Sequence, residues 1–362
     1  MMQNKIVQII LGAGRPFSGD QNASLKKVSN DTRVLDWTLQ AAKFLNPEVH
    51  FVAGYQIDEI VSRYPSLHYT INPEWSSTGP IFSLLEAQVV DDSEYIVSYG
   101  DILFREQTIK DLLDLDSDVS IAVDSKWKER YSTRTLEDLN LSEKVIISED
   151  RLIGSNANIS LDEANAEFIG LLTFKPKVMR FLRENYESLP SEMRKANLTK
   201  LIEYLQEKGF EIKIIDVEGD WAELNKAHDL ANFILGTKAQ SLKRLEDVIT
   251  MSKIAPQISF TVEEWNNKSK EIINVIQSKF ELKKIIVRSS AISEDGFDSS
   301  NAGAYVSVLN IDAKDQKEIL ASVTRVIDSY ADKNLAKNSG IVFFDIQSKN
   351  IKKKILKYLK FS

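Results

Sequence analysis

Strand-like and helix-like segments alternate over the first 235 residues, and this alternation constrains the fold more than any other feature of the sequence. Mostly apolar runs predict strands at residues 5–11, 48–53, 67–71, 95–98 and 119–123. Segments between them carry apolar residues at helical spacing. Because parallel strands need long crossover connections, usually helices, this order predicts an α/β fold with a Rossmann-like, mostly parallel mixed sheet.

The chain has 362 residues, which is long for one hydrophobic core, so we expect two units. The predicted domains are an N-terminal domain at 1–235, a smaller α+β domain at 236–332 and a divergent lysine-rich tail at 333–362. Within that tail, residues 349–360 are interpreted as a solvated segment, with a basic amphipathic helix as the alternative.

Composition excludes several classes of function. The net charge is -7 and basic residues are not clustered before residue 340, which argues against nucleic acid as the main partner. The chain has no cysteine, and its three histidines form no metal motif, so thiolate nucleophiles and Cys-based zinc sites are excluded. The sequence contains no apolar run of about 20 residues and no signal peptide, so a cytoplasmic protein without a membrane span is expected.

Two predicted strand ends carry residue types that bind phosphate and metal ions. Gly12 and Gly14 follow the first strand, and glycines let backbone N–H groups approach phosphate oxygens. An ordinary glycine-rich turn is the alternative. Asp101 follows Gly100 after a central strand, where ligands of open α/β sheets bind, and a carboxylate there suits Mg²⁺. A turn aspartate is the alternative.

Residues 220–225 offer further oxygen ligands. Glu223 and Asn225 alternate, so an extended segment would place both on one face. Asn225 would complete a Mg²⁺ site with Asp101, or it would cap the helix predicted at 226–235, and the two roles are compatible.

Residues 72–87 form a polar turn that runs into a predicted helix. The free N–H groups of a helix N-terminus favour anions or carbonyl acceptors. Simple capping of the helix by Ser77 or Thr78 is the alternative.

Together these four segments resemble the sugar-nucleotide and choline-phosphate nucleotidyltransferases. That family has a Gly-rich loop after strand one, an Asn-Pro-x-aromatic…Ser-Leu-x-x-Ala segment, a Gly-Asp after the fourth strand and a late metal ligand. The corresponding positions here are residues 12–15, 72–87, 100–101 and 220–225. Residues 167–170 also resemble the family's Glu-x-x-Gly strand near the acceptor site.

The resemblance implies a GT-A-like nucleotidyltransferase fold with Mg²⁺, a nucleoside triphosphate (CTP favoured) and a phosphorylated small molecule as acceptor. It assigns catalysis to Arg15, Lys26 and Asp101, and metal binding to Asp101 and Asn225. The implied nucleotide-binding residues are Leu11, Gly12, Ala13, Gly14, Thr78, Gly79, Ser83 and Gly100. The implied acceptor-binding residues are Glu167, Trp221 and Glu223.

The first loop departs from the family pattern, in which an Arg and a later Pro-Lys neutralise the triphosphate. Ser18 stands at the expected Arg position here. Either Arg15, Lys26 or Lys27 substitutes, or the domain binds nucleotide poorly or has lost catalysis. A non-catalytic nucleotide-binding or scaffold domain is therefore the alternative function.

Residues 236–332 resemble the ATP-grasp nucleotide-binding domain of phosphoenolpyruvate synthase and pyruvate phosphate dikinase. The matching segments are residues 236–239, 286–291, 294–295, 300–303 and 308–310. The resemblance assigns ATP-phosphate contacts to Lys238 and Arg288, with a surface lysine and a strand-end ion pair as the alternatives. No further strand is recognisable after Tyr330, so we expect a partial domain and a truncated or frame-shifted end.

The order of the two domains resembles the L-glutamine kinases of bacterial capsule phosphoramidate synthesis. This resemblance implies a role in capsule or surface-polysaccharide modification. The predicted function is a nucleotidyltransferase that releases pyrophosphate. The alternative is a non-catalytic fragment of an L-glutamine kinase or of a phosphoenolpyruvate synthase-like phosphotransferase.

Overall fold

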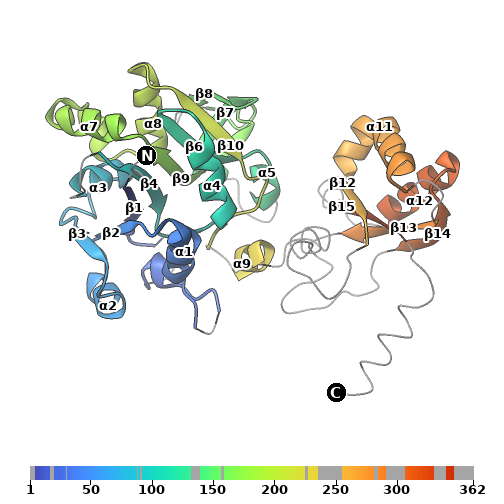
Figure 1. Ribbon diagram of the computed structural model, residues 1–362, viewed down its shortest axis with the longest axis horizontal. Coiled ribbons are helices and arrows are strands. Elements are labelled where there is room, and N and C mark those ends of the chain that lie inside the picture. Colours follow the sequence, from blue (N-terminus) through green and yellow to red (C-terminus); the bar gives the residue numbers. More distant parts are fainter. Residues whose placement is uncertain are drawn as a thin grey trace. The chain divides into compact units, whose positions relative to one another are not determined.

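The structure, a computed structural model, describes residues 5–16, 20–29, 31–87, 89, 92–131, 139–155, 159–224, 227–234, 255–280, 284–290, 306–329 and 340–345. The chain divides into two compact units, Met1–Phe233 and Ile234–Ser362 (Figure 1). Each unit has its own sheet and its own hydrophobic core. None of the described helices is both long and apolar enough to cross a bilayer.

Among the described residues, the first unit is built on a nine-stranded sheet with the order β3-β2-β1-β4-β9-β6-β10-β8-β7. Its strands are β1 (Ile6–Leu11), β2 (Glu48–Ala53), β3 (His68–Ile71), β4 (Glu94–Tyr99), β6 (Val119–Asp124), β7 (Lys144–Ser148), β8 (Arg151–Ser155), β9 (Ala166–Phe174) and β10 (Ile212–Asp216). Of these strands, β8 and β9 run opposite to the rest. The predicted α/β class is confirmed.

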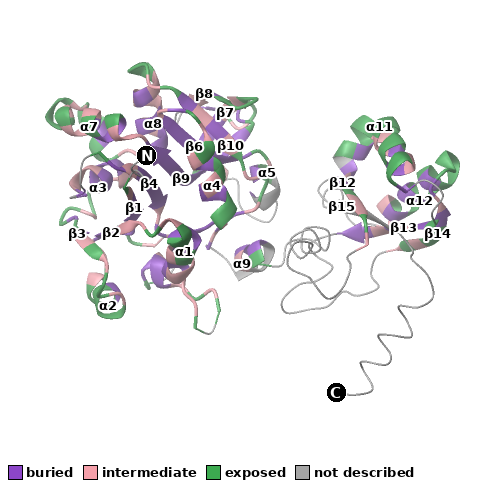
Figure 2. Ribbon diagram, in the orientation of Figure 1, coloured by how far each residue is buried: buried purple, intermediate pink, exposed green. Residues whose placement is uncertain are grey.

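Helices cover both faces of this sheet, so its central strands are buried on both sides (Figure 2). The helices are α1 (Val34–Ala42), α2 (Ile57–Arg63), α3 (Pro80–Glu86), α4 (Glu106–Asp114), α5 (Trp127–Arg130), α7 (Pro176–Glu184), α8 (Leu198–Glu207) and α9 (Ala227–Ile234). Neighbouring residues of β1 enter opposite layers: Ile9 packs in the core that contains Leu201 of α8, and Ile10 packs with Leu35 of α1. This burial on two faces explains why the sequence of β1 is an almost continuous run of apolar residues.

Short 3₁₀ helices lie at Ala23–Leu25, Lys43–Leu45, Tyr186–Ser188 and Ser191–Arg194. The last of these lies just before α8. The Asn197 side chain accepts a hydrogen bond from the Lys200 N–H, so it caps α8 and separates this helix from the preceding 3₁₀ turn.

A second, two-stranded sheet joins β5 (Ile102–Leu103) to β11 (Ala222–Glu223) in antiparallel fashion. The pairing places Glu223 opposite Ile102. It therefore brings the segment before α9 against the residue that follows Asp101.

The second unit contains a four-stranded antiparallel sheet with the order β12-β15-β13-β14. Its described elements are β12 (Gln257–Thr261), α11 (Val262–Phe280), β13 (Lys284–Ser290), β14 (Ser307–Asp312), α12 (Gln316–Asp328) and β15 (Gly340–Asp345). Phe260, Ile276, Val287 and Val323 form the centre of its core. The expectation that no strand follows Tyr330 was wrong, because β15 lies between β12 and β13 in this sheet.

Candidate functional site

A cleft of about 580 Å³ opens at the carboxyl ends of β1 and β4. These two strands are parallel neighbours, and the chain connects away from them in opposite directions across the sheet, which is where open α/β sheets bind ligands. The cleft is lined by thirteen of the predicted site residues: Leu11, Gly12, Ala13, Gly14, Arg15, Thr78, Gly79, Ser83, Gly100, Asp101, Glu167, Trp221 and Glu223. The four sequence segments thus meet in one place.

Two glycine turns line the cleft and touch each other. The Gly100 N–H donates to the Leu11 carbonyl at 2.9 Å. A Cβ atom at Gly100 would lie 2.6 Å from Ser24 Oγ and 3.0 Å from Gly12 Cα. The close approach of the two turns therefore requires glycine at position 100.

Two buried asparagines hold the loops around the cleft. Asn22 donates from Nδ2 to the carbonyls of Gly12 and Tyr55, both at 3.0 Å, and fixes the first loop. Asn72 donates to the hydroxyls of Thr78 and Ser83, both at 3.0 Å, and fixes the segment that leads into α3. Neither asparagine was among the site residues predicted from the sequence, although Asn72 opens one of the motifs.

Asp101 lies beside a second carboxylate. Loss of hydration and the nearby Glu223 carboxylate raise the pKa of Asp101 to about 7, while a backbone hydrogen bond and Lys26 act in the opposite direction. The Leu224 N–H donates to the Asp101 carbonyl at 3.4 Å. A divalent cation would relieve the repulsion between the two carboxylates, and their oxygens are the ligands that Mg²⁺ prefers.

Asn225, the other predicted metal ligand, lies outside the described residues, so its role stays a prediction. The described residue before it, Leu224, is hydrogen-bonded to Asp101. Within the described part of the chain, no three His, Asp or Glu side chains form a group that could hold a metal ion. A metal ion bound by Asp101 would therefore need further ligands, such as amide, phosphate or water oxygens.

The two predicted catalytic cations have different positions. Arg15 is exposed at the rim of the cleft, where its Nη2 lies 2.9 Å from Asp20 Oδ1. Lys26 is not among the lining residues, and its Nζ donates to the Leu224 carbonyl at 2.6 Å. Ser18 lies outside the described residues.

Carboxylates and aromatic rings also line the cleft. The Tyr131 hydroxyl donates to Glu167 Oε1 at 2.8 Å, and the Tyr99 hydroxyl donates to Glu143 Oε1 at 2.6 Å. Trp221 is buried and donates from its indole N–H to Asp124 Oδ2 at 2.8 Å. The three residues predicted to bind the acceptor, Glu167, Trp221 and Glu223, all line the cleft, and Glu223 is the carboxylate beside Asp101.

Glu143, Tyr99 and Tyr131 were not among the site residues predicted from the sequence. One local signal existed for Tyr99. Gly170, in the Glu-x-x-Gly motif, has a φ of +84°, and a Cβ there would lie 2.3 Å from Cδ2 of the Tyr99 ring. The glycine is needed to accept this ring. Trp127 and Tyr131 are buried in a small cluster with Ile159.

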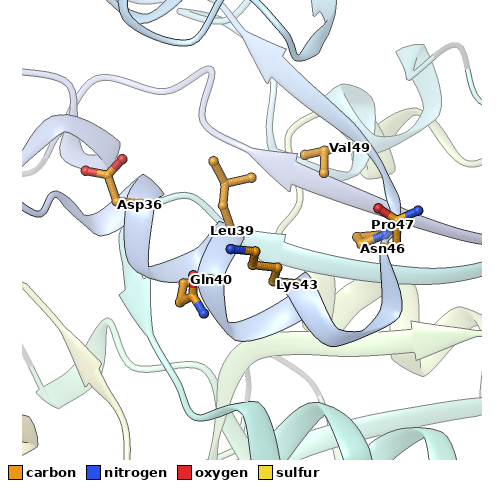
Figure 3. Close-up of a pocket in the computed structure, with 7 residues that line it drawn as sticks. All are labelled: Asp36, Leu39, Gln40, Lys43, Asn46, Pro47 and Val49. Atoms are coloured by element: carbon orange, nitrogen blue, oxygen red, sulfur yellow. The ribbon is translucent and has the colours of Figure 1, made fainter.

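A second hollow, of about 410 Å³, lies beside α1 and the start of β2 (Figure 3). It is lined by Asp36, Leu39, Gln40, Lys43, Asn46, Pro47 and Val49. Val49 is near the amino end of β2, so this hollow is at the opposite edge of the sheet from the cleft. It contains none of the predicted site residues.

In the second unit, Arg288 lies on β13, opposite Ser307 of β14 and Val342 of β15. Lys238 lies outside the described residues, as do the matching segments at 294–295 and 300–303. The predicted ATP contacts of Lys238 and Arg288 stay predictions.

Comparisons with known proteins cover both units. The chain is 25% identical over 246 residues to a CTP:phosphoglutamine cytidylyltransferase of Campylobacter jejuni. The aligned region covers 61% of this chain and 96% of that protein. An inositol-1-phosphate CTP transferase from T. maritima is 17% identical, with a TM-score of 0.48 over 65% of this chain and 98% of that one. A protein from Bacillus anthracis assigned as a glucose-1-phosphate thymidylyltransferase is 14% identical, with a TM-score of 0.49 over 64% and 95% of the two chains.

Residues 201–335 match the family of the pyruvate phosphate dikinase AMP/ATP-binding domain. This match begins inside α8, whereas the first compact unit extends to Phe233. The structural boundary describes the physical unit better, because β10 pairs with β6 in the first sheet. The chain thus combines a nucleotidyltransferase-like N-terminal part with a segment that matches the dikinase AMP/ATP-binding domain, which confirms the predicted combination.

Proposed function

We propose that the first unit transfers a cytidylyl group from CTP to the phosphate of a small acceptor and releases pyrophosphate. One observation carries the proposal: the two glycine turns, the Thr78–Ser83 segment and Asp101 line the same cleft as the carboxylates and aromatic rings Glu143, Glu167, Tyr99 and Tyr131. The cytidylyltransferase of C. jejuni supports CTP as the nucleotide and a phosphorylated acceptor.

The reaction needs no side-chain nucleophile. An oxygen of the acceptor phosphate attacks the α-phosphorus of CTP and forms a new phosphoanhydride bond. The bond from the α-phosphorus to the oxygen that bridges to the β-phosphorus breaks, and its electron pair leaves with pyrophosphate. The protein's task is to place the two phosphates in line and to balance their charge.

The lining residues divide this task. Backbone N–H groups of the turn after Gly12, whose own N–H donates to the Val52 carbonyl at 3.0 Å, bind phosphate oxygens of the nucleotide, and Arg15 adds positive charge at the rim. Thr78, Gly79 and Ser83 hold the nucleoside. Asp101 and Asn225 would hold Mg²⁺, which when bound neutralises charge on the triphosphate and the leaving pyrophosphate. Glu167, Trp221 and Glu223 hold the acceptor.

The finer parts of the proposal rest on similarity. The second unit would bind ATP through Lys238 and Arg288, as its match to the dikinase domain suggests. Phosphoglutamine, the compound in the name of the C. jejuni relative, is a candidate acceptor, and capsule modification is the proposed context. A non-catalytic nucleotide-binding domain is the second candidate, and the engagement of Lys26 by the Leu224 carbonyl favours it.

The test is a thermal-shift screen with the four nucleoside triphosphates and Mg²⁺, followed by pyrophosphate release with CTP and phosphorylated acceptors. We expect CTP to raise the unfolding temperature most. Asp101→Asn should remove the Mg²⁺-dependent part of the shift, whereas Asp114→Asn, an exposed charge-matched control on α4, should keep it. A shift without pyrophosphate release would support the non-catalytic alternative, and no shift with any nucleotide would exclude both.

A further inference from the structure

Trp75 is a large aromatic residue that lines the cleft and was not among the site residues predicted from the sequence. It lies in the turn between β3 and α3, and its side chain is half-buried. The indole N–H groups of Trp37 and Trp221 donate to protein oxygens at 2.7 and 2.8 Å, whereas that of Trp75 makes no hydrogen bond within the described part of the chain. Part of this ring therefore remains available to a ligand in the cleft.

The turn after β2 holds Trp75 against the first loop. A Cβ atom at Gly54 would lie 2.7 Å from the Ala13 carbonyl oxygen and 2.7 Å from both Cβ and Cγ of Trp75. Only glycine at position 54 therefore allows Trp75 to approach the first loop this closely. The next residue, Tyr55, donates its N–H to the same Ala13 carbonyl at 2.9 Å, which fixes the turn to the loop.

The Tyr55 ring connects Trp75 to the cation at the rim of the cleft. The rings of Tyr55 and Trp75 pack edge to face, with their centroids 5.4 Å apart. The guanidinium carbon of Arg15 lies 5.9 Å from the centre of the same Tyr55 ring. Because Arg15 and Trp75 both line the cleft, a ligand whose phosphates reach the first loop and Arg15 would bring the group attached to those phosphates toward Trp75.

We propose that Trp75 is the platform on which the nucleoside of the bound nucleotide stacks, with the base against the indole ring. This inference rests on the proposed function of the cleft. An indole that is already held in place offers a planar apolar face at a low cost in side-chain entropy. Stacking on an aromatic ring tolerates any base, because every base has a π-face. Trp75 therefore contributes affinity for the nucleotide, while other contacts choose between bases.

The first experiment separates the nucleoside from the phosphates. Binding of CTP and of inorganic tripolyphosphate to the full chain is measured by calorimetry in the presence of Mg²⁺. Trp75→Leu should weaken CTP binding by about 5- to 100-fold, the range for one base stacked on an aromatic ring, and should leave tripolyphosphate binding unchanged. Phe44→Leu, a similar change at an exposed ring that does not line the cleft, should bind both probes like the parent protein. An unchanged CTP affinity in Trp75→Leu, or an equal loss for both probes, would overturn the inference.

Indole fluorescence gives a second readout, which a purely structural role of Trp75 would not produce. CTP should quench the fluorescence of the parent protein, because the base stacks directly on an indole. Trp75→Phe keeps an aromatic face, so it should retain most of the CTP affinity but lose most of the quenching. Trp37→Phe, whose ring does not line the cleft, should retain the quenching. Quenching of the parent size in Trp75→Phe would contradict the proposal.

The outcomes separate this inference from the proposed function. If CTP raises the unfolding temperature and pyrophosphate is released, but Trp75→Leu binds CTP as tightly as the parent protein, the cleft is a nucleotidyltransferase site in which the nucleoside does not stack on Trp75. If no nucleotide binds to the parent protein, the proposed function itself fails.

Discussion

The Lys26 ammonium group donates a hydrogen bond of 2.6 Å to the carbonyl oxygen of Leu224, although 198 residues separate the two in sequence. The bond joins the segment after the first loop to the end of β11. Lys26 also counteracts the rise in the pKa of Asp101. Lys26 is not one of the cleft-lining residues, so we interpret it as a positioning residue.

We predict that Lys26→Met lowers the free energy of unfolding by about 1–3 kcal/mol, because a charge-assisted hydrogen bond is lost and a carbonyl is left unpaired. It should also reduce pyrophosphate release. Thermal unfolding and the release assay test this together. Lys26→Arg, which retains a cation, should recover part of both quantities. If Lys26→Met leaves unfolding unchanged, the bond has no structural importance.

The contact between the glycine turns leads to a second prediction. Gly100→Ala should destabilise the first unit by about 1–3 kcal/mol, because the new methyl group overlaps the Gly12 turn. The CTP-induced thermal shift should disappear, since the phosphate-binding backbone would be displaced. Gly154→Ala, where no atom lies within 4 Å of the added Cβ, is the matched control and should unfold like the parent protein. Equal stability of the two variants would show that the two turns can move apart without lowering the free energy of unfolding.

The raised pKa of Glu143 predicts how stability depends on pH. Its ordinary pKa is 4.5 and its folded-state pKa is about 8, so its protonated form favours folding. That contribution is complete below pH 4.5 and is lost as the pH rises to about 8. Glu143→Gln should therefore stabilise the first unit by about 2–4 kcal/mol at pH 8 and by little at pH 4.5. Urea unfolding at several pH values measures this, and a constant difference between the proteins would contradict it.

Arg105 holds α9 against the two-stranded sheet. Its guanidinium group donates to Asp220 at 3.2 Å and to the Phe233 carbonyl at 2.5 Å, and it lies 3.9 Å from the centre of the Phe233 ring. Arg105→Ala should lower stability by about 2–4 kcal/mol, and Arg105→Lys should recover little, because an ammonium cannot stack and donate in a fork. Hydrogen exchange of α9 tests the prediction. Unchanged protection in Arg105→Ala would mean that other contacts hold the helix.

The parts of the fold that could be predicted are those with long periodic patterns. The buried strands β1, β4 and β6 were predicted nearly at their observed ends, because a run of apolar residues marks each of them. The helices between the strands, α1 and α4 among them, were predicted from apolar residues at helical spacing. The two-residue strands β5 and β11 have no such pattern. Their pairing is set by tertiary contacts, which local spacing does not contain.

The residues of the site likewise divide into those that lie in a sequence motif and those that do not. Gly12, Asp101 and Glu223 lie in motifs with a fixed order along the chain, so their meeting in the cleft could be predicted. Glu143 lies in no motif, and only the folded chain brings it to Tyr99, which is 44 residues away in sequence. Asn22 and Asn72 act through hydrogen bonds to neighbouring loops, and a polar residue of this kind cannot be distinguished in sequence from a solvated one.

The pairing of β5 with β11 has a consequence for how the protein is made. A ribosome produces both glycine turns and Asp101 in the first third of the chain, but Trp221 and Glu223 follow some 120 residues later, and β10 must enter the sheet beside β6 just before them. During translation the nascent first unit therefore exposes an open sheet edge and an unfinished cleft, and neither is closed until shortly before synthesis of the second unit begins.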